Sequence, residues 1–428
     1  MTKNKRNVIE LLAPAGNLEK MKTALTFGAD AVYAGIPDFS LRVRINDFDL
    51  EKIQEATELC HQLGKKIYIT TNIFAHNKHL DKLTEYVKVL KKIGVDALIA
   101  ADPGVIQVIK SVWSQAEIHL STQANCTNWQ AAKFWHDLGV QRVVLGREVA
   151  LSEIKEIKKR VPKLELEYFI HGAMCMAYSG RCFLSKHFVD KSANLGDCVQ
   201  PCRWKYNVKH EKLNSDSHFI SEEKRPNSPL EIIEEEHGTY ILNSKDLMLL
   251  DYLEELIDAG VTSFKIEGRA KSVYYQAMIA GIYRRAIDLL LTDKKEAKKE
   301  IKKMKKDLEE KIVSRGFTTG FLVGDKADED IENTHQAIGW EFCGQVVKAS
   351  TKKGKSFLTL VKVHNVIKTG DEIEIVMPYY EVKKMKLKKM YDVKTEELIE
   401  KAHGGQEKMV LIETSFEIPE FSVLRRKV

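Results

Sequence analysis

Four of the seven cysteines in this chain lie within 28 residues of one another, directly after an apolar run at residues 164–170. They are separated by six, fifteen and three residues: Cys175, Cys182, Cys198 and Cys202. The first ten residues are charged and contain no apolar segment typical of a signal peptide, so we expect reduced thiols rather than a disulfide framework. Four clustered thiolates are best explained by a bound metal.

The spacing of these cysteines favours an iron–sulfur cluster over zinc. Zinc sites usually place about two to four residues between the first two ligands, whereas six residues separate Cys175 from Cys182. Iron–sulfur ligands come from looser loops and need only converge. Zinc, and thiols that stay reduced or form disulfides, remain the alternatives. Cys60, Cys126 and Cys343 are scattered, and we interpret them as small buried apolar residues.

The elements that would position this loop alternate between short β-branched runs and amphipathic stretches, several of which end in glycine. Eight runs are predicted as strands: residues 8–12, 31–34, 67–71, 97–101, 117–121, 142–145, 164–170 and 263–266. The predicted helices include residues 50–63, 80–93, 129–138 and 247–259. Eight such units predict an α/β fold, a (β/α)8 TIM-like barrel. A doubly wound open sheet is the alternative, although no G-x-G-x-x-G follows the first strand.

Barrel enzymes build their sites at the carboxyl ends of the strands, so polar residues at those ends are the candidates for chemistry. They are Asn17, Tyr33, Asn72, Asp102, Gln123, Asn125, Arg147, Glu148, His171, Lys265, Glu267 and Arg269. The catalytic candidates are Arg147, His171, Lys265, Glu267 and Arg269, and the substrate-binding candidates are Asn72, Asp102, Gln123 and Asn125. Because the cysteine loop leaves the seventh strand at the same end, we expect the thiols and these residues to lie together at that end of the barrel, which we call its mouth.

Each candidate also has a purely structural interpretation. Asparagine is a common turn or cap residue, and charged residues at a barrel rim often pair with one another. The structural alternatives are caps for Asn72 and Asn125, rim ion pairs for Lys265, Glu267 and Arg269, a self-contained pair of Arg147 with Glu148, and a core or orienting role for His171.

The organisation changes beyond the barrel, which we assign to residues 1–292, with the cysteine loop at 175–202. A polar insertion at 210–239 is interpreted as a flexible surface excursion. Residues 293–335 comprise a helix with lysines at four-residue intervals and a connector, and residues 336–428 alternate like strands and predict a small closed β-barrel. One stretch of this last domain mixes lysine with tyrosine, which suits single-stranded RNA. Its candidate contacts are Lys383, Lys384, Lys386 and Tyr391.

Composition bounds the class of protein. Hydrophobic residues make up 44% of the chain, enough for a large core, and no apolar run is long enough to cross a bilayer. We therefore predict a cytoplasmic protein without a membrane segment. The formal charge of +6, from 67 basic and 61 acidic residues, is too mild to identify a nucleic-acid partner by itself.

The stretch at residues 167–175, followed by 180–182, resembles the signature of the collagenase-like peptidase family U32, in which Glu, Gly, Cys, Gly and Cys recur at this spacing. Further resemblance lies in residues 12–17, 28–35, 119–125, 265–269 and 315–320. The resemblance implies a barrel, a C-terminal β-domain and a four-cysteine cluster, taken here as [4Fe-4S] with its nuclearity open. The implied ligands are Cys175, Cys182, Cys198 and Cys202.

Within that family, the likeness is greatest to members that hydroxylate tRNA. It implies formation of 5-hydroxyuridine at wobble position 34, with prephenate as hydroxyl source, without oxygen, and with the tRNA anticodon stem-loop as partner. Arg147, Lys265 and Arg269 are expected to receive the carboxylates of prephenate, on the strength of their strand-end positions alone. Whether a paralogous partner subunit takes part is left open.

Two other functions compete with this interpretation. The family name suggests a peptidase, but the chain contains neither H-E-x-x-H nor G-x-S-x-G. A cysteine peptidase that used Cys175 with His171 would not need three further thiols. The second competitor is a non-catalytic iron–sulfur protein that binds RNA.

Overall fold

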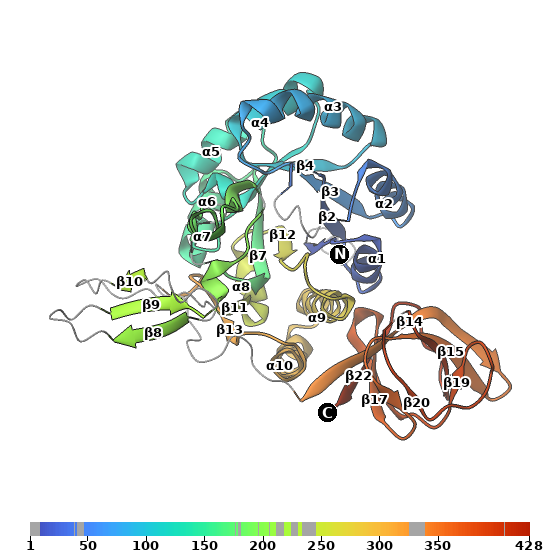
Figure 1. Ribbon diagram of the computed structural model, residues 1–428. Helices are drawn as coiled ribbons and strands as arrows, with labels where there is room; N and C mark the ends of the chain where they lie inside the picture. Colours follow the sequence, from blue (N-terminus) through green and yellow to red (C-terminus); the bar gives the residue numbers. More distant parts are fainter. Residues whose placement is uncertain are drawn as a thin grey trace.

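The structure is a computed structural model of the 428-residue chain. It describes residues 9–37, 39–40, 47–175, 177–178, 181–195, 197–204, 206–210, 218–223, 230–232, 245–324, 339–405 and 407–428. Figure 1 shows a barrel surrounded by helices, a small antiparallel sheet that projects from it, and a C-terminal domain of strands.

Eight parallel strands close into a barrel, which confirms the predicted fold. The strands are β1 (Glu10–Pro14), β2 (Ala31–Gly35), β3 (Lys66–Thr70), β4 (Ala97–Ala100), β5 (Ile118–Leu120), β6 (Arg142–Val144), β7 (Glu165–Ala173) and β12 (Ser263–Ile266). They pair in the order β12-β1-β2-β3-β4-β5-β6-β7, and β12 also pairs with β7. Lys265 marks the closure, because it lies opposite both Leu12 of β1 and Phe169 of β7.

Helices cover the outside of the barrel. They are α1 (Leu18–Thr26), α2 (Leu50–Gln62), α3 (Asn77–Ile93), α4 (Pro103–Val112), α5 (Trp129–Asp137), α6 (Leu151–Arg160) and α9 (Val273–Thr292). Asn17, Asp49, Asp102 and Asn128 cap four of them, because each side chain accepts a hydrogen bond from the backbone N–H three residues later. The predicted helices after the second, third and fifth strands are confirmed.

The helix predicted at 247–259 is wrong in its first half. Its start lies in β11 (Asp246–Met248), which pairs antiparallel with the end of β7, and helix forms only in α8 (Leu253–Asp258), after the 3-10 turn Leu250–Tyr252. β7 continues past the barrel rim to Ala173, opposite Asp246, so it offers an extra edge for pairing. Strand β13 (Phe317–Thr318) then adds to β11.

The polar insertion contains regular structure where it is described. Strands β8 (Tyr206–His210), β9 (His218–Glu222) and β10 (Leu230–Ile232) form an antiparallel sheet that projects from the barrel (Figure 1). Part of the segment predicted as a flexible excursion therefore forms strands, in which Val208 is paired with Ile220 in the backbone register. The remainder of 210–239 lies outside the described residues.

The lysine-rich segment forms α10 (Lys294–Lys311), as predicted, and packs against α9. Beyond it lie β14 (Trp340–Lys353), β15 (Ser356–Val363), β17 (Glu372–Met377), β18 (Glu381–Lys386), β19 (Met390–Asp392), β21 (Met409–Thr414) and β22 (Val423–Lys427). These strands pair in the order β18-β17-β22-β14-β15-β21-β19, and the short β16 (Ile367–Lys368) and β20 (Lys401–Ala402) pair separately. The C-terminal antiparallel domain is thus confirmed, although its end strands β18 and β19 do not hydrogen-bond to each other in the described ladder.

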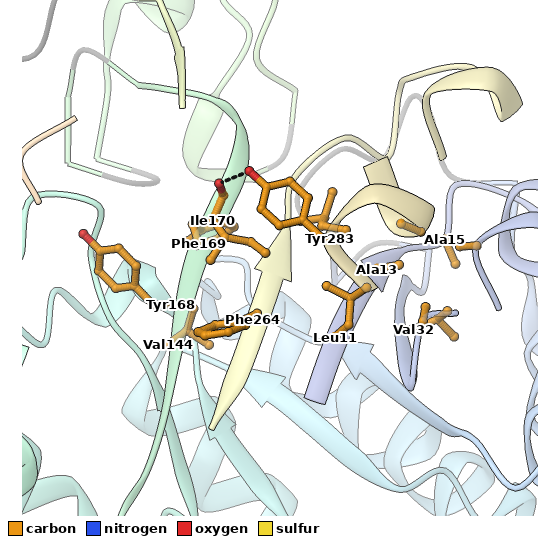
Figure 2. Close-up of a cluster of buried hydrophobic side chains, with 14 of the residues drawn as sticks. Leu11, Ala13, Ala15, Val32, Val144, Tyr168, Phe169, Ile170, Phe264 and Tyr283 are labelled. Atoms are coloured by element: carbon orange, nitrogen blue, oxygen red, sulfur yellow. Dashed lines mark hydrogen bonds between the residues drawn. The ribbon is translucent and has the colours of Figure 1, made fainter. Parts of the chain in front are cut away.

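Three clusters of buried hydrophobic residues stabilise the molecule, and the smallest of them contains Leu12, Tyr33 and Tyr68 of the barrel strands. The largest lies between the outward faces of the barrel strands and the helices, and Figure 2 shows Leu11, Val32 and Phe264 in it, with Tyr283 of α9 reaching Ile170. The second fills the C-terminal domain. Among the described residues, no helix combines the length and apolar character needed to span a bilayer.

Candidate functional site

A ladder of opposite charges runs through the interior of the barrel. Lys265 Nζ lies 2.6 Å from Glu167 Oε1, and Arg142 links the other oxygen of Glu167, at 3.3 Å, to Glu10 Oε1, at 2.6 Å. Glu167 is fully buried, and Lys265 is only 5% exposed. The charges therefore alternate from Glu10 near the start of β1 to Lys265, one residue before the end of β12.

Strand geometry explains why these side chains meet. Successive residues of a strand point to opposite faces, so Glu167 and Phe169 of β7 face inward together, as do Ser263 and Lys265 of β12. Ser263 Oγ donates to Glu10 Oε1 at 2.8 Å and lies 3.3 Å from Glu167 Oε2. Every carboxylate of the ladder is thus held by several partners, as buried charges require.

The ladder keeps Glu167 ionised. Burial raises the pKa of Glu167, but the charges of Lys265 and Arg142 outweigh this, and the pKa lies below its ordinary value. Burial lowers the pKa of Lys265, and the neighbouring Glu167 opposes that shift. Lys265 and Glu167 therefore form a charged pair, and the ammonium of Lys265 lies toward the mouth of the barrel.

Three cations gather at that mouth around two aromatic rings. Lys265 Nζ lies 4.6 Å from the ring centroid of Tyr33 and 5.5 Å from that of Phe169. The guanidinium of Arg147 stacks on Phe169 at 3.8 Å, and that of Arg269 lies 5.7 Å from Tyr33. The structure thus brings together three of the predicted catalytic residues, and their shared chemistry is attraction for an anion.

Buried amides form a second part of the mouth. Asn72 Nδ2 donates to Ser121 Oγ at 3.2 Å, and Ser121 Oγ donates to Gln123 Oε1 at 3.2 Å. Within the described part of the chain, Gln123 Nε2 and Asn125 Oδ1 are buried without a hydrogen-bond partner. A buried polar atom normally has a partner, so these two atoms are open to a water molecule or a ligand. Asn72, Gln123 and Asn125 therefore fit the predicted substrate contacts.

Other predicted residues have different roles. Asp102 Oδ1 accepts from Val105 N at 3.1 Å, so Asp102 caps α4, and its predicted contact with substrate stays a prediction. Glu267 joins the strands through its backbone: its N–H donates to His171 O, and its carbonyl accepts from Tyr275 OH. The side chain of Glu267 is half-buried, and its catalytic role stays a prediction.

His171 is misassigned as a catalytic residue. Its ring packs among Tyr275, Tyr283 and Phe317, and its Nδ1 lies 3.2 Å from the hydroxyl of Tyr283. That hydroxyl donates to Ile170 O, as Figure 2 shows, so His171 Nδ1 is the donor in the other bond. Burial lowers the pKa of His171 to about 3, and the residue acts as a neutral core histidine.

The cysteine loop begins two residues after β7, at the carboxyl end of the barrel. Cys175 and Cys198 are exposed, Cys182 and Cys202 are half-buried, and all four are free thiols. The short α7 (Leu184–Val189) lies within the loop, and the N–H of Gln200 donates to Cys198 Sγ at 3.3 Å. Burial raises the pKa of Cys182, and the nearby thiols of Cys175 and Cys198 raise it further.

The donor set of this loop fits an iron–sulfur cluster in its chemistry. Soft thiolates and backbone N–H groups directed at sulfur are the features that such clusters use. As the chain stands, no three His, Cys, Asp or Glu side chains of the described residues are gathered closely enough to hold a metal ion. By contrast, burial raises the pKa of Cys60, Cys126 and Cys343 to about 12, which agrees with their interpretation as core residues.

The predicted basic and aromatic stretch does not form a single surface. Lys384 and Lys386 lie on β18, whereas Tyr391 lies on β19 at the opposite end of the sheet and donates to Glu413 at 3.2 Å. Lys383 faces away from Lys384 and covers Phe416, 4.9 Å from the ring centroid.

Sequence reasoning missed the inner members of the ladder, Glu10 and Arg142, and assigned no role to Glu167. The available signal was a charged residue inside each otherwise apolar strand. Glu167, in particular, stands within the run 164–170. Since a charge in a buried strand needs a partner, these residues could have been predicted to pair across the barrel.

The fold and site define a closed (β/α)8-barrel protein with a cationic mouth, a four-thiol loop beside it and a C-terminal antiparallel domain. Residues 16–332 match the family model "Peptidase family U32", and residues 339–425 match "Peptidase family U32 C-terminal domain". The chain belongs to peptidase family U32.

Named relatives differ in what their names say they do. The chain is 40% identical over 396 residues to "tRNA hydroxylation protein P" of Escherichia coli, covering 86% of each chain. It is 33% identical to "23S rRNA 5-hydroxycytidine C2501 synthase" of the same organism, covering 86% of this chain and 52% of that one. It is 30% identical to "Collagenase" of Porphyromonas gingivalis, covering 94% of each.

Proposed function

We propose that this protein is an RNA hydroxylase that forms 5-hydroxyuridine at wobble position 34 of tRNA. Prephenate serves as the hydroxyl source, oxygen is not required, and Cys175, Cys182, Cys198 and Cys202 hold a [4Fe-4S] cluster. In this reaction the C5–H bond of uracil is replaced by C5–OH, a two-electron oxidation. Prephenate supplies the oxygen and takes up the two electrons as its C–OH becomes C–H.

The relatives support a tRNA substrate. The tRNA hydroxylation protein matches along 86% of its own length, whereas the ribosomal RNA enzyme matches along only 52%. The matched length includes both family domains of this chain. A substrate of the tRNA type is therefore favoured over ribosomal RNA.

The observation that carries the proposal is the convergence of Arg147, Lys265 and Arg269 on the side of the barrel from which the thiol loop departs. Prephenate carries two carboxylates, and guanidinium groups bind carboxylates through paired hydrogen bonds. Lys265, held by Glu167, adds a fixed positive charge between the two arginines. A cluster bound by the loop would supply one-electron chemistry or Lewis acidity next to that anion.

The buried amides support a base as the second reactant. A uracil presents one N–H donor between two carbonyl acceptors, and Gln123 Nε2 and Asn125 Oδ1 offer an open donor and an open acceptor. A target base must leave its stack to reach a barrel mouth. In the proposed complex, these amides select the flipped uracil while the cations hold prephenate.

A cysteine substitution tests the proposal. Cys198→Ala should abolish the visible absorption and iron content of anaerobically purified protein, and also the 5-hydroxyuridine of tRNA in a complemented deletion strain. The control is Cys60→Ala, which removes a buried thiol outside the loop and should leave both signals in place. Full hydroxylation by cluster-free protein would contradict the proposal.

The peptidase alternative has a test of its own. A Cys–His catalytic pair would need His171 near Cys175, but the His171 ring is enclosed by Tyr275, Tyr283 and Phe317. We therefore expect no gelatin cleavage by highly purified, cluster-loaded protein. Cleavage that is lost in the Cys175→Ala variant would reverse this ranking.

A further inference from the structure

The C-terminal domain contains a groove that the barrel chemistry does not use. Its volume is about 460 Å³. Its walls come from four strands of the domain, and the lining residues are Trp340, Glu372, Ile373, Glu374, Lys384, Met385, Lys386 and Lys427.

Strand register explains why these residues share one face. Glu372 lies opposite Lys386 and Glu374 opposite Lys384, while Glu374 also lies opposite Arg425 on the next strand. Trp340 lies opposite Lys427 at the far wall. Because alternate residues of paired strands point the same way, the charged side chains and the indole all project from one face of the sheet.

The same face continues into the interface with the barrel. Arg425 is fully buried beside α9 and α10, with its NH2 group 2.7 Å from Glu374 Oε2. Tyr274, in the first turn of α9, stacks on Phe342 and donates to Lys311 O, the last residue of α10. The first turn of α9 follows the carboxyl end of β12, so the groove lies toward the mouth end of the barrel.

The charge of the groove favours a polyanion. Glu374 is already paired with Arg425, Lys311 and Lys384, and the Nζ atoms of Lys311 and Lys384 each lie 3.1 Å from its carboxylate. Lys384, Lys386 and Lys427 are exposed, and within the described residues Lys386 and Lys427 have no ion-pair partner. Only the exposed Glu372 opposes them.

Trp340 supplies the apolar part of the groove. The indole is half-buried, and Lys311 Nζ lies 4.5 Å from its ring centroid, which fixes the ring at the groove wall. Lysines that neutralise phosphate next to a fixed aromatic ring are the combination with which proteins hold single-stranded nucleic acid.

We propose that this groove binds an unpaired segment of the RNA substrate, with a base on Trp340 and phosphates on Lys386, Lys427 and Lys384. The inference rests on the proposed function, because it takes the substrate to be RNA. It assigns the C-terminal domain the task of holding the RNA at the end of the barrel where the target base enters.

A matched pair of triple variants tests the groove in the full-length protein. One variant carries Lys384→Ala, Lys386→Ala and Lys427→Ala. The control carries Lys352→Ala, Lys353→Ala and Lys355→Ala, which removes the same charge at the opposite end of β14 from Trp340. Fluorescence anisotropy with an anticodon stem-loop RNA is measured across a salt series.

The groove variant should bind at least about tenfold more weakly at low salt, and the slope of log Kd against log salt should become shallower by about two, since roughly 0.7 counterions are released per single-strand phosphate. The control should bind like the wild type. Trp340→Ala should weaken binding by about 5- to 100-fold, the range expected for loss of one stacked base, whereas Trp340→Tyr should retain most of it.

Hydroxylation of tRNA by the same proteins separates the two hypotheses. If the groove variants bind RNA like the wild type while tRNA is still hydroxylated, the groove assignment is overturned and the proposed function stands. If the wild type neither binds the stem-loop nor hydroxylates tRNA, both are overturned. If weak binding of the groove variant is matched by the control, general charge rather than the groove is responsible, and the inference fails.

Discussion

At the scale of residues, the unusual feature is a chain of ionised groups inside a barrel that most proteins fill with apolar side chains. Burying charge is unfavourable unless each group is paired, and here Glu167 touches both Lys265 and Arg142. The ladder therefore does not explain stability by itself. The ladder instead fixes the position of the Lys265 ammonium between Tyr33 and Phe169 at the mouth.

Removing the carboxylate of Glu167 should show that the two buried cations depend on it. Glu167→Gln leaves Lys265 and Arg142 buried without their shared counter-charge, and we expect the free energy of unfolding to fall by about 3–5 kcal/mol. Glu165→Gln is the control, because Glu165 also pairs with Arg142 but is 48% exposed, and it should cost about 1 kcal/mol or less. Urea denaturation measures both, and equal losses would contradict the ladder's role.

His171 predicts a pH dependence. Its pKa is about 3 in the folded state, below the ordinary 6.5, so the unfolded chain takes up a proton that the folded protein does not. Stability should therefore fall as the pH decreases from about 6.5, by up to about 1.4 kcal/mol per pH unit. His171→Gln removes this contribution. Between pH 7 and 5 the wild type should lose about 2 kcal/mol more than the variant, and parallel pH profiles would refute the assignment.

At the scale of elements, β7 organises the site. Its inward residues supply Glu167 and Phe169, and its extension past the rim pairs with β11 and leads into the cysteine loop. Gly172 makes the extension possible. Its φ is 115°, and a Cβ at this position would lie 2.5 Å from the carbonyl oxygen of Glu267.

Alanine at this position should therefore be poorly tolerated. Gly172→Ala adds a clash with backbone to an unfavourable φ, and we expect a loss of about 2–4 kcal/mol together with weaker iron binding, because the loop's origin shifts. Gly354→Ala is the control: its φ is 64°, but nothing lies near its Cβ, so about 1 kcal/mol is expected. Thermal unfolding and iron content provide the comparison.

At the scale of the whole molecule, charges also join the two domains. Arg425 of the C-terminal sheet is fully buried and binds Glu374, while Lys311 of α10 reaches the same carboxylate at 3.1 Å. Tyr380 bonds to Asp307 beside them. These polar contacts join the two domains beside an apolar contact, in which Val376, Tyr380 and Val423 of the C-terminal domain pack into the largest core.

These polar contacts between the domains predict that the barrel and the C-terminal domain unfold together. Arg425→Leu leaves Glu374 with fewer partners in a buried interface, and we expect a loss of about 3–5 kcal/mol and a separate, earlier transition of the C-terminal domain in calorimetry. Arg426→Leu is the control, because Arg426 faces away from the barrel and pairs with Glu341 and Asp371 within the C-terminal domain, so the two domains should still unfold together. A single unchanged transition in the Arg425 variant would contradict the coupling.

Local patterns were sufficient for much of the fold. All eight barrel strands follow from β-branched runs, because the apolar period of a strand depends only on its own residues. The helix at 247–259 was misjudged because pairing with β7, a distant strand, outweighed the local leucine spacing. The same reason explains the misplaced residue. His171 stands at a strand end, but only the direction of its side chain shows whether it reaches the mouth.

The sequence alone determined which residues are candidates for chemistry, since four thiols in one loop and cations after two strands are properties of residue type and spacing. Tertiary structure decided which of those residues meet. It joined Glu10, Arg142, Glu167 and Lys265 across four strands, and it placed Lys384 and Tyr391 on strands at opposite ends of the sheet order although both lie within eight residues. The physical reason is that contacts between strands are set by barrel closure and sheet register, which no local stretch of sequence contains.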